Sequence, residues 1–153
     1  MDNIGIPENL KLAETIILNG IIGYCHTHDE NYDTIGIKTI RKVKRLNGSE
    51  EEQIVGEFPF TKEMEDKCGW HNSYASIQML IGDTPIDMNH IDETKIVSMM
   101  GEVDSKYYHR YSDYTGYLWT TEGFKCGGHD IPDILECNIG KYIHMEIELY
   151  KRK

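Results

Sequence analysis

The sequence predicts an α+β fold in a single domain, residues 1–153, built mainly on antiparallel sheet with two or three short helices. Alternating or β-branched runs recur along the chain, and tight-turn dipeptides separate several of them. Only brief stretches show helical spacing. The chain has no internal repeat and no linker long enough to divide it, which favours one domain of mixed class.

Two β-hairpins are expected in the first 60 residues. Leu10 to Leu18 alternates loosely, and Ile21 to Thr27 follows after Asn19-Gly20, a dipeptide that suits a two-residue hairpin loop. The second hairpin joins the β-branched run Thr34 to Leu46 to the strand Gln53 to Phe60 through another Asn-Gly turn.

The middle of the chain favours short helices. Thr61 is an expected N-cap, because acidic residues follow it in what would be the first helical turn. Asn72 to Leu80 is expected as a second helix, since Tyr74, Ile77 and Leu80 recur at helical spacing. Lys95 to Val103 fits either a strand or a helix.

Strands dominate the last third. Tyr107 to Tyr111 and Tyr117 to Lys125 are expected strands, and Asp130 is expected to cap a short helix that ends at Glu136. Lys141 to Tyr150 alternates apolar and polar residues throughout, which predicts a half-buried strand.

The composition is that of an ordinary globular protein, with 39% hydrophobic and 27% charged residues. The N-terminus lacks a basic stretch followed by a long apolar one, and no segment approaches the roughly 20 apolar residues of a membrane span. We therefore expect a cytoplasmic protein that does not enter a membrane and keeps its cysteines reduced.

The net charge is −10, and the acidic residues gather in the middle of the chain. Thirteen Asp and Glu residues lie between Leu46 and Ser105, against three lysines. Such a surface repels phosphate backbones and attracts basic surfaces, so we expect a protein partner with a basic surface and no direct binding of nucleic acid. Since carboxylates can imitate phosphates, a nucleic-acid mimic is one form of such binding.

Basic residues gather elsewhere, on the first strand of the second hairpin. On an alternating strand, such a basic stripe is more typical of a solvated edge than of a nucleic-acid contact. The stripe consists of Lys38, Arg41, Lys42, Lys44 and Arg45.

Three of the four cysteines are followed three residues later by a histidine. A Cys-x-x-His pair offers two ligands for tetrahedral zinc, and a glycine after the cysteine lets both side chains reach one side of the turn. We therefore expect zinc at a site formed by Cys68, His71, Cys126 and His129, with Cys25 and His28 as substitutes for either pair. The alternative is a set of plain buried thiols, with Gly127-Gly128 only a connector to a helix.

Two enzymatic alternatives stay open. Cys68 precedes the second expected helix, an arrangement that can activate a thiol. Its base would be His71, His90, His109 or His144. The segment 69–80 resembles the nucleophile helix of papain-like peptidases, which implies cysteine hydrolysis, but Asn72 stands where that family has its cysteine. His26 and His28 precede a run of acidic residues, a pattern typical of a catalytic metal site and equally of a solvated loop.

Aromatic residues crowd the segment 107–119. Tyr, Trp and Arg dominate binding hot spots, because each brings a large contact area and a polar tip. Strand alternation predicts that about half of these side chains are core, and that the rest form a protein-binding face or, alternatively, a platform for a nucleotide. The candidate binding residues are Tyr107, Tyr108, Arg110, Tyr111, Tyr114 and Trp119.

These features predict a small acidic binding module without enzymatic activity, of the inhibitor or adaptor type. It would act through the Tyr-rich face and the acidic surface, with zinc holding the fold together. The alternatives are a cysteine- or metal-dependent hydrolase and a small-ligand binder of nucleotide type.

Overall fold

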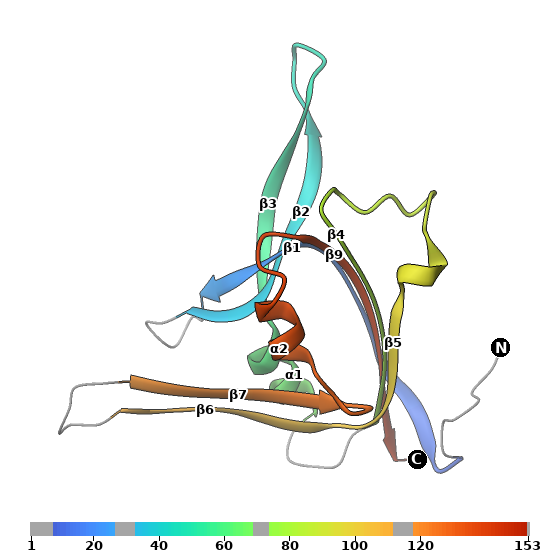
Figure 1. Cartoon of the computed structure of the whole chain (residues 1–153), viewed down its shortest axis with the longest axis vertical. Coiled ribbons are helices and arrows are strands. Elements are labelled where there is room, and N and C mark those ends of the chain that lie inside the picture. The colour runs from blue at the N-terminus through green and yellow to red at the C-terminus, as the bar shows by residue number, and fades with distance from the viewer. Residues whose placement is uncertain (1–7, 27–32, 69–73, 112–117, 153) are drawn as a thin grey trace.

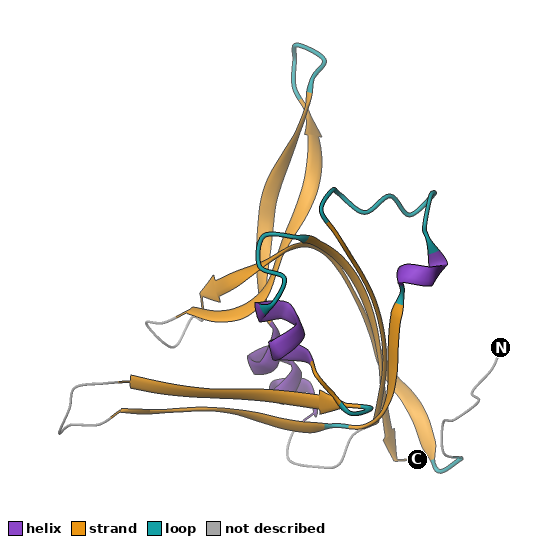
Figure 2. Ribbon diagram, viewed as in Figure 1, coloured by secondary structure: helices purple, strands orange, loops and turns teal. Residues whose placement is uncertain are grey.

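The computed structural model describes residues 8–26, 33–68, 74–111 and 118–152, and leaves aside the side chains of residues 26, 33, 68, 105–111, 118–122 and 152. Strands make up most of the described chain, with two short helices and one 3-10 turn (Figure 2). The expected fold, mainly antiparallel sheet with short helices, is confirmed, and the sheet is its dominant part.

The larger sheet has six strands in the order β3-β2-β1-β9-β4-β5, and each pair of neighbouring strands is antiparallel. The C-terminal strand therefore lies in the middle of the sheet, between β1 and β4 (Figure 1). The strands are β1 (Leu10–His26), β2 (Asp33–Lys44), β3 (Glu50–Pro59), β4 (Tyr74–Gly82), β5 (Val97–Glu102) and β9 (Tyr142–Arg152).

One face of this sheet carries the core. Ile147 of β9 pairs with Ile16 of β1 on one side and with Ile77 of β4 on the other, and all three are buried. Burying one such side chain contributes roughly 1.5–3 kcal/mol, so aligned apolar residues on neighbouring strands fix the register. The sheet curves around the two helices, which lie on this inner face (Figure 1).

Helix α1 (Phe60–Cys68) follows β3 directly and buries Phe60 and Met64, which lie one turn apart. The prediction that Thr61 is its N-cap is wrong, because the helix already begins at Phe60. Thr61 therefore lies inside the first turn, where it is buried. The helix itself, with acidic Glu63 near its start, is confirmed.

A second sheet, of order β6-β7-β8, consists of β6 (Asp104–Tyr111), β7 (Leu118–Cys126) and β8 (His129–Asp130). The strands β6 and β7 form a long ribbon that extends away from the rest of the molecule (Figure 1). Helix α2 (Ile131–Glu136) follows β8, as expected, and Asp130 holds its N-cap position, but the Asp130 side chain makes no capping hydrogen bond. The Asp130 carboxylate Oδ1 accepts a hydrogen bond from the Phe124 backbone N–H at 3.1 Å, which ties the helix start to the ribbon.

The hairpin expected at Asn19-Gly20 is wrong. β1 runs without interruption through both residues and pairs with β9 on one side and β2 on the other. Gly20 serves close packing and not a turn, since a Cβ there would lie 2.1 Å from the backbone oxygen of Lys38. Asn19 uses its side chain for a contact with His144 of β9.

The helix expected over Asn72–Leu80 is also wrong, because its described part is β4. Ala75, Ile77 and Met79 are buried with a period of two, while Leu80 is only partly buried. Backbone pairing with β9 and β5 on both sides outweighs the weak helical spacing of this short run. The resemblance of 69–80 to a nucleophile helix therefore fails from residue 74 onward.

Other expectations about the elements are confirmed. β2 and β3 form a hairpin that turns at Asn47-Gly48, where Gly48 has a φ of 87°. The segment Lys95 to Val103, which fitted either a strand or a helix, follows a 3-10 turn (Glu93–Lys95) and forms β5.

Neither helix in the described part of the chain has the length and apolar character that crossing a membrane requires.

Candidate functional site

Most of the candidate binding residues lie on the β6–β7 ribbon. Tyr107, Tyr108, Arg110 and Tyr111 belong to β6 and Trp119 to β7, whereas Tyr114 lies outside the described residues. In the antiparallel register, position 108 pairs with 121 and position 110 with 119. The backbone therefore brings Arg110 and Trp119 to directly opposite positions on neighbouring strands.

The ribbon has one side toward the helices and one side away from them. Phe124 of β7 is fully buried, and its ring packs edge to face on Phe60 of α1 with the centroids 5.2 Å apart. Lys125, the next residue, is exposed. Because strand positions alternate, positions 108, 110 and 119 share the Lys125 side, and 107, 109 and 111 share the Phe124 side.

The described half of the expected zinc site is a tight hairpin. Cys126 and His129 pair across Gly127-Gly128, and both glycines have a positive φ, 57° and 83°, as a two-residue hairpin loop demands. The Cys126 thiol is buried and donates to the backbone oxygen of Ala75 at 3.5 Å, while the His129 side chain is exposed. The side chains of Cys68 and His71 lie outside the described residues.

Cys25, one of the expected substitutes, lies far from Cys126 along the sheet. Ala75 pairs with Leu149, and Leu149 pairs with Glu14, eleven residues before Cys25 on β1. Eleven residues of strand correspond to roughly 35 Å along the chain. His28, like His26 as a side chain, falls outside the described part, within which no three His, Cys, Asp or Glu side chains are grouped for a metal.

The basic stripe of β2 lies against glutamates of β3. Opposite charges at directly paired positions attract, so the hairpin as a whole offers little net positive potential to a phosphate backbone. At the end of the stripe, Arg45 Nη1 also lies 3.7 Å from Glu51 Oε2. The paired positions are Lys38 with Glu57, Lys42 with Glu52 and Lys44 with Glu50.

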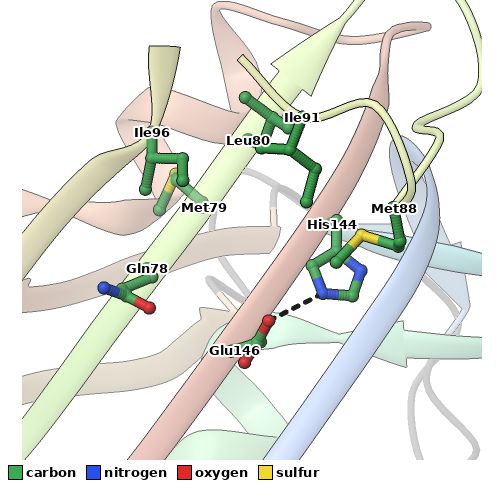
Figure 3. A pocket seen from close by; sticks show the side chains of 8 residues that line it. All are labelled: Gln78, Met79, Leu80, Met88, Ile91, Ile96, His144 and Glu146. Carbon is green, nitrogen blue, oxygen red and sulfur yellow. Dashed lines mark hydrogen bonds and ion pairs between the residues drawn. The ribbon is translucent and has the colours of Figure 1, made fainter. Parts of the chain in front are cut away.

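A cleft that the sequence did not indicate lies on the outer face of the sheet. The segment between β4 and β5 covers part of this face and closes an apolar compartment of about 50 Å³ against β4 and β9 (Figure 3). Met88, Ile91 and Ile96 come from the covering segment, Leu80 from β4, and His144 and Glu146 from β9.

His144 is held by hydrogen bonds on both ring nitrogens. Its Nδ1 lies 3.1 Å from Asn19 Nδ2, and its Nε2 lies 3.0 Å from Glu146 Oε2 (Figure 3). Because the amide nitrogen of Asn19 can only donate, Nδ1 accepts and the ring proton sits on Nε2, directed at the carboxylate. The His144 side chain is only 13% exposed. No serine, threonine or cysteine lines this compartment in the described part of the chain, so the imidazole has no hydroxyl or thiol beside it to activate.

A second, charged compartment of about 340 Å³ adjoins the first. Met88 lines both, and Asn19, which bonds to His144, lines the second. The charged residues along its lining come from the hairpin and from the covering segment: Arg41, Lys42, Glu52 and Asp87. Lys42 and Glu52 pair across the two strands and so share one face, and Arg41, the neighbouring position, alternates to the other.

The covering segment is ordered by its own side chains. Asp87 accepts from the Asn89 backbone N–H at 2.9 Å and contacts His90 Nδ1 at 2.8 Å, and these bonds hold the pKa of its carboxyl below the usual value. Asp92 accepts from the Thr94 hydroxyl and backbone N–H, which lowers the pKa of that carboxyl and caps the 3-10 turn. The cleft therefore has a structured cover.

Sequence reasoning missed this cleft for identifiable reasons. The Asn19-Gly20 dipeptide predicts a turn, and the alternation of 141–150 makes His144 and Glu146 outward residues, with His144 otherwise only one of four candidate bases for Cys68. The available signal was their spacing, since two residues apart on a strand puts both side chains on one face. Their partner on β1 lies 125 residues away in the sequence and has no local signature.

Comparison of the chain with protein-family models, with curated proteins and with solved structures found no match. The function therefore has to follow from the geometry and charge of the residues.

Proposed function

We propose that the protein is a small non-enzymatic binding module of the inhibitor or adaptor type that engages a protein partner with a basic surface. Contact is made by the outward side of the β6–β7 ribbon, at Tyr108, Arg110 and Trp119, together with exposed carboxylates. The main support is the register of the ribbon, in which these three positions lie on the side opposite to buried Phe124.

The shape of the ribbon suits binding. A two-stranded ribbon that extends from the body offers one side to a partner while the other packs on the helices (Figure 1). Two aromatic residues and an arginine at adjoining positions match the composition of binding hot spots, where few residues supply most of the affinity. Tyr107 and Tyr111, on the Phe124 side, are then assigned to packing and not to the partner.

The distribution of charge supports a basic partner. The cations of β2 are offset by glutamates of β3, so the net charge of −10 comes from carboxylates elsewhere. The covering segment exposes Asp83, Asp87, Asp92 and Glu93. Such a surface suits a partner that itself binds nucleic acid, with the carboxylates in place of phosphates. A cytoplasmic setting agrees with the exposed free thiol of Cys137.

Simultaneous replacement of Tyr108, Arg110 and Trp119 by alanine is expected to abolish partner capture. The loss of even one hot-spot residue costs about 2 kcal/mol or more of binding, so affinity should fall more than thirtyfold. The measurement is affinity capture with the wild-type and the triple variant as baits, quantified by mass spectrometry. Captured partners should also elute as salt rises, because charge attraction is screened.

The stability of the triple variant decides whether these residues are core. Its thermal midpoint should stay near that of the wild type, whereas Tyr107→Ala with Tyr111→Ala should lower it. Unchanged capture by the triple variant, or unfolding of that variant, would contradict the proposal. Indifference of the complex to salt would remove the role of the carboxylates.

We also propose a structural zinc ion on Cys68, His71, Cys126 and His129. In support, Cys126 lies beside Ala75, only four residues after His71 in the sequence. Purified, chelator-free protein should contain one zinc per chain by elemental analysis and native mass spectrometry. Cys126→Ser should lose the metal and Cys137→Ser, the control, should keep it. Wild-type protein without stoichiometric metal would show that these are plain thiols.

A further inference from the structure

We infer that the apolar compartment of the outer-face cleft binds a small aliphatic primary amine, with its alkyl chain against Leu80 and Ile96 and its ammonium group at Glu146. This site is separate from the proposed protein contact, because it lies on the six-stranded sheet and not on the β6–β7 ribbon. Three properties of the described residues support it: an apolar inner end, a carboxylate at the mouth and a volume that limits the chain.

The compartment is more buried at one end than at the other. His144 of β9 pairs with Leu80 of β4, and Glu146 pairs with Gln78, so these outward positions form two adjoining rows across the two strands (Figure 3). Leu80 is partly buried and the His144 side chain is 13% exposed, whereas Gln78 is exposed and the Glu146 side chain is 46% exposed. The first row therefore lies deeper, and the second row forms the mouth.

The inner end suits an aliphatic chain. Leu80, Met88, Ile91 and Ile96 line the compartment, and no Phe, Tyr or Trp of the described residues does so. A purine or pyrimidine would therefore find no stacking partner of that kind, whereas each methylene of an alkyl chain gains from leaving water. Met88 has the flexible side chain that adapts to such a chain.

Glu146 places a negative charge at the mouth that no cation of the described chain neutralises. Its Oε2 accepts from His144 Nε2, and among the described side chains this is its only hydrogen bond or ion pair. The imidazole is neutral, because its Nδ1 accepts from the Asn19 amide, so it does not cancel the charge. The other carboxylate oxygen, Oε1, is therefore left to a ligand.

A primary ammonium group fits these acceptors. It is compact and carries three N–H donors, which can reach Glu146 Oε1 and the side-chain carbonyl of neighbouring Gln78. No lysine or arginine lines the compartment in the described part of the chain, so an anion would meet only the repulsion of the carboxylate.

The volume of the compartment limits the length of the alkyl chain. A water-sized sphere takes roughly 10–15 Å³ of such a cavity, so the compartment of about 50 Å³ holds roughly three to five non-hydrogen atoms. With the ammonium group at the mouth, a chain of about four or five carbons fills it. Further methylenes would extend into water and add little.

The probe for this site is n-pentylamine, titrated at neutral pH into the full-length protein and followed by NMR shifts. We expect saturable one-to-one binding, with the largest shifts in 78–80, 88–96 and 144–146. From n-propylamine to n-pentylamine, affinity should rise roughly fourfold per methylene, and n-heptylamine should gain at most about twofold over n-pentylamine. Pentan-1-ol and pentanoate should bind at least about fivefold more weakly, because neither carries the ammonium group.

Two matched variants separate the ammonium contact from general charge. Glu146→Gln keeps an acceptor for His144 but removes the charge, so it should weaken n-pentylamine at least about fivefold and leave pentan-1-ol unchanged. Glu93→Gln removes an equal charge from the covering segment outside the lining and should leave both affinities unchanged. Met88→Ala, at an exposed position, should weaken both ligands alike, because it removes apolar contact only.

Thermal melts establish that the variants are folded. Absence of saturable binding, equal binding of pentan-1-ol or pentanoate, or an equal effect of Glu146→Gln and Glu93→Gln would each overturn the inference. Tighter binding of leucyl-glycinamide than of n-pentylamine would also overturn it, in favour of the N-terminal residue of a peptide. Because the ribbon does not line this site, loss of partner capture in the ribbon variant leaves amine binding intact, and the two proposals fail separately.

Discussion

Gly20→Ala is expected to lower the free energy of unfolding by about 3 kcal/mol. An alanine Cβ at this position would lie 2.1 Å from the Lys38 backbone oxygen and 2.8 Å from its carbonyl carbon, so β2 would have to move away from β1. Because both strands belong to the middle of the sheet, the shift would disturb the buried face. Urea denaturation, followed by far-UV circular dichroism, measures the change.

Gly23→Ala is the matched control, three residues along the same strand. Its Cβ would meet only the Lys38 side chain, at 3.7 Å, which is ordinary contact. Stability should therefore be unchanged or rise by up to about 1 kcal/mol, because alanine restricts the unfolded chain. Equal stability of the Gly20 and Gly23 variants would contradict the close approach of β1 and β2.

Met79→Ala is expected to cost roughly 2–5 kcal/mol of stability, because this side chain is 1% exposed on the inner face of β4. The replacement leaves a cavity in the core cluster that the surrounding side chains fill only in part. Thermal and urea unfolding should both show the loss, with an unchanged dependence on denaturant if the native fold is kept.

Leu80→Ala is the comparison that separates strand from helix. Leu80 lies on the other face of β4, partly buried, so its truncation should cost only about 1 kcal/mol. In a helix, Tyr74, Ile77 and Leu80 would be buried together and Met79 would lie off that face. The stability loss would then be larger for Leu80→Ala than for Met79→Ala. A larger loss for Leu80→Ala than for Met79→Ala would therefore contradict β4 as a strand.

The elements that sequence reasoning predicted are those whose pattern is local. β9 alternates apolar and polar residues over its whole length, and its inner residues Ile143, Met145 and Ile147 are all buried. The β2–β3 hairpin carries its own turn signal in Asn47-Gly48. In both cases a few neighbouring residues contain the information, because strand period and turn geometry are short-range properties.

The two wrong elements depended on partners distant in the sequence. Asn19-Gly20 is a good turn dipeptide, but β9 and β2 pair with β1 on both sides and keep it extended. The helical spacing over 74–80 is weak, and pairing with β9 and β5 overrides it. Local preference amounts to a few tenths of a kcal/mol per residue, which tertiary burial readily exceeds.

By itself, the sequence determined a sheet-rich fold, an acidic molecule and a cluster of aromatic residues on two expected strands, because composition and a period of two can be recognised without knowing which segments pair. Only the tertiary structure decided which side of the ribbon packs on α1, that glutamates lie beside the basic stripe, and that Asn19 meets His144 beneath the covering segment. Those contacts join residues up to 125 positions apart, and only the pairing of the strands makes them neighbours.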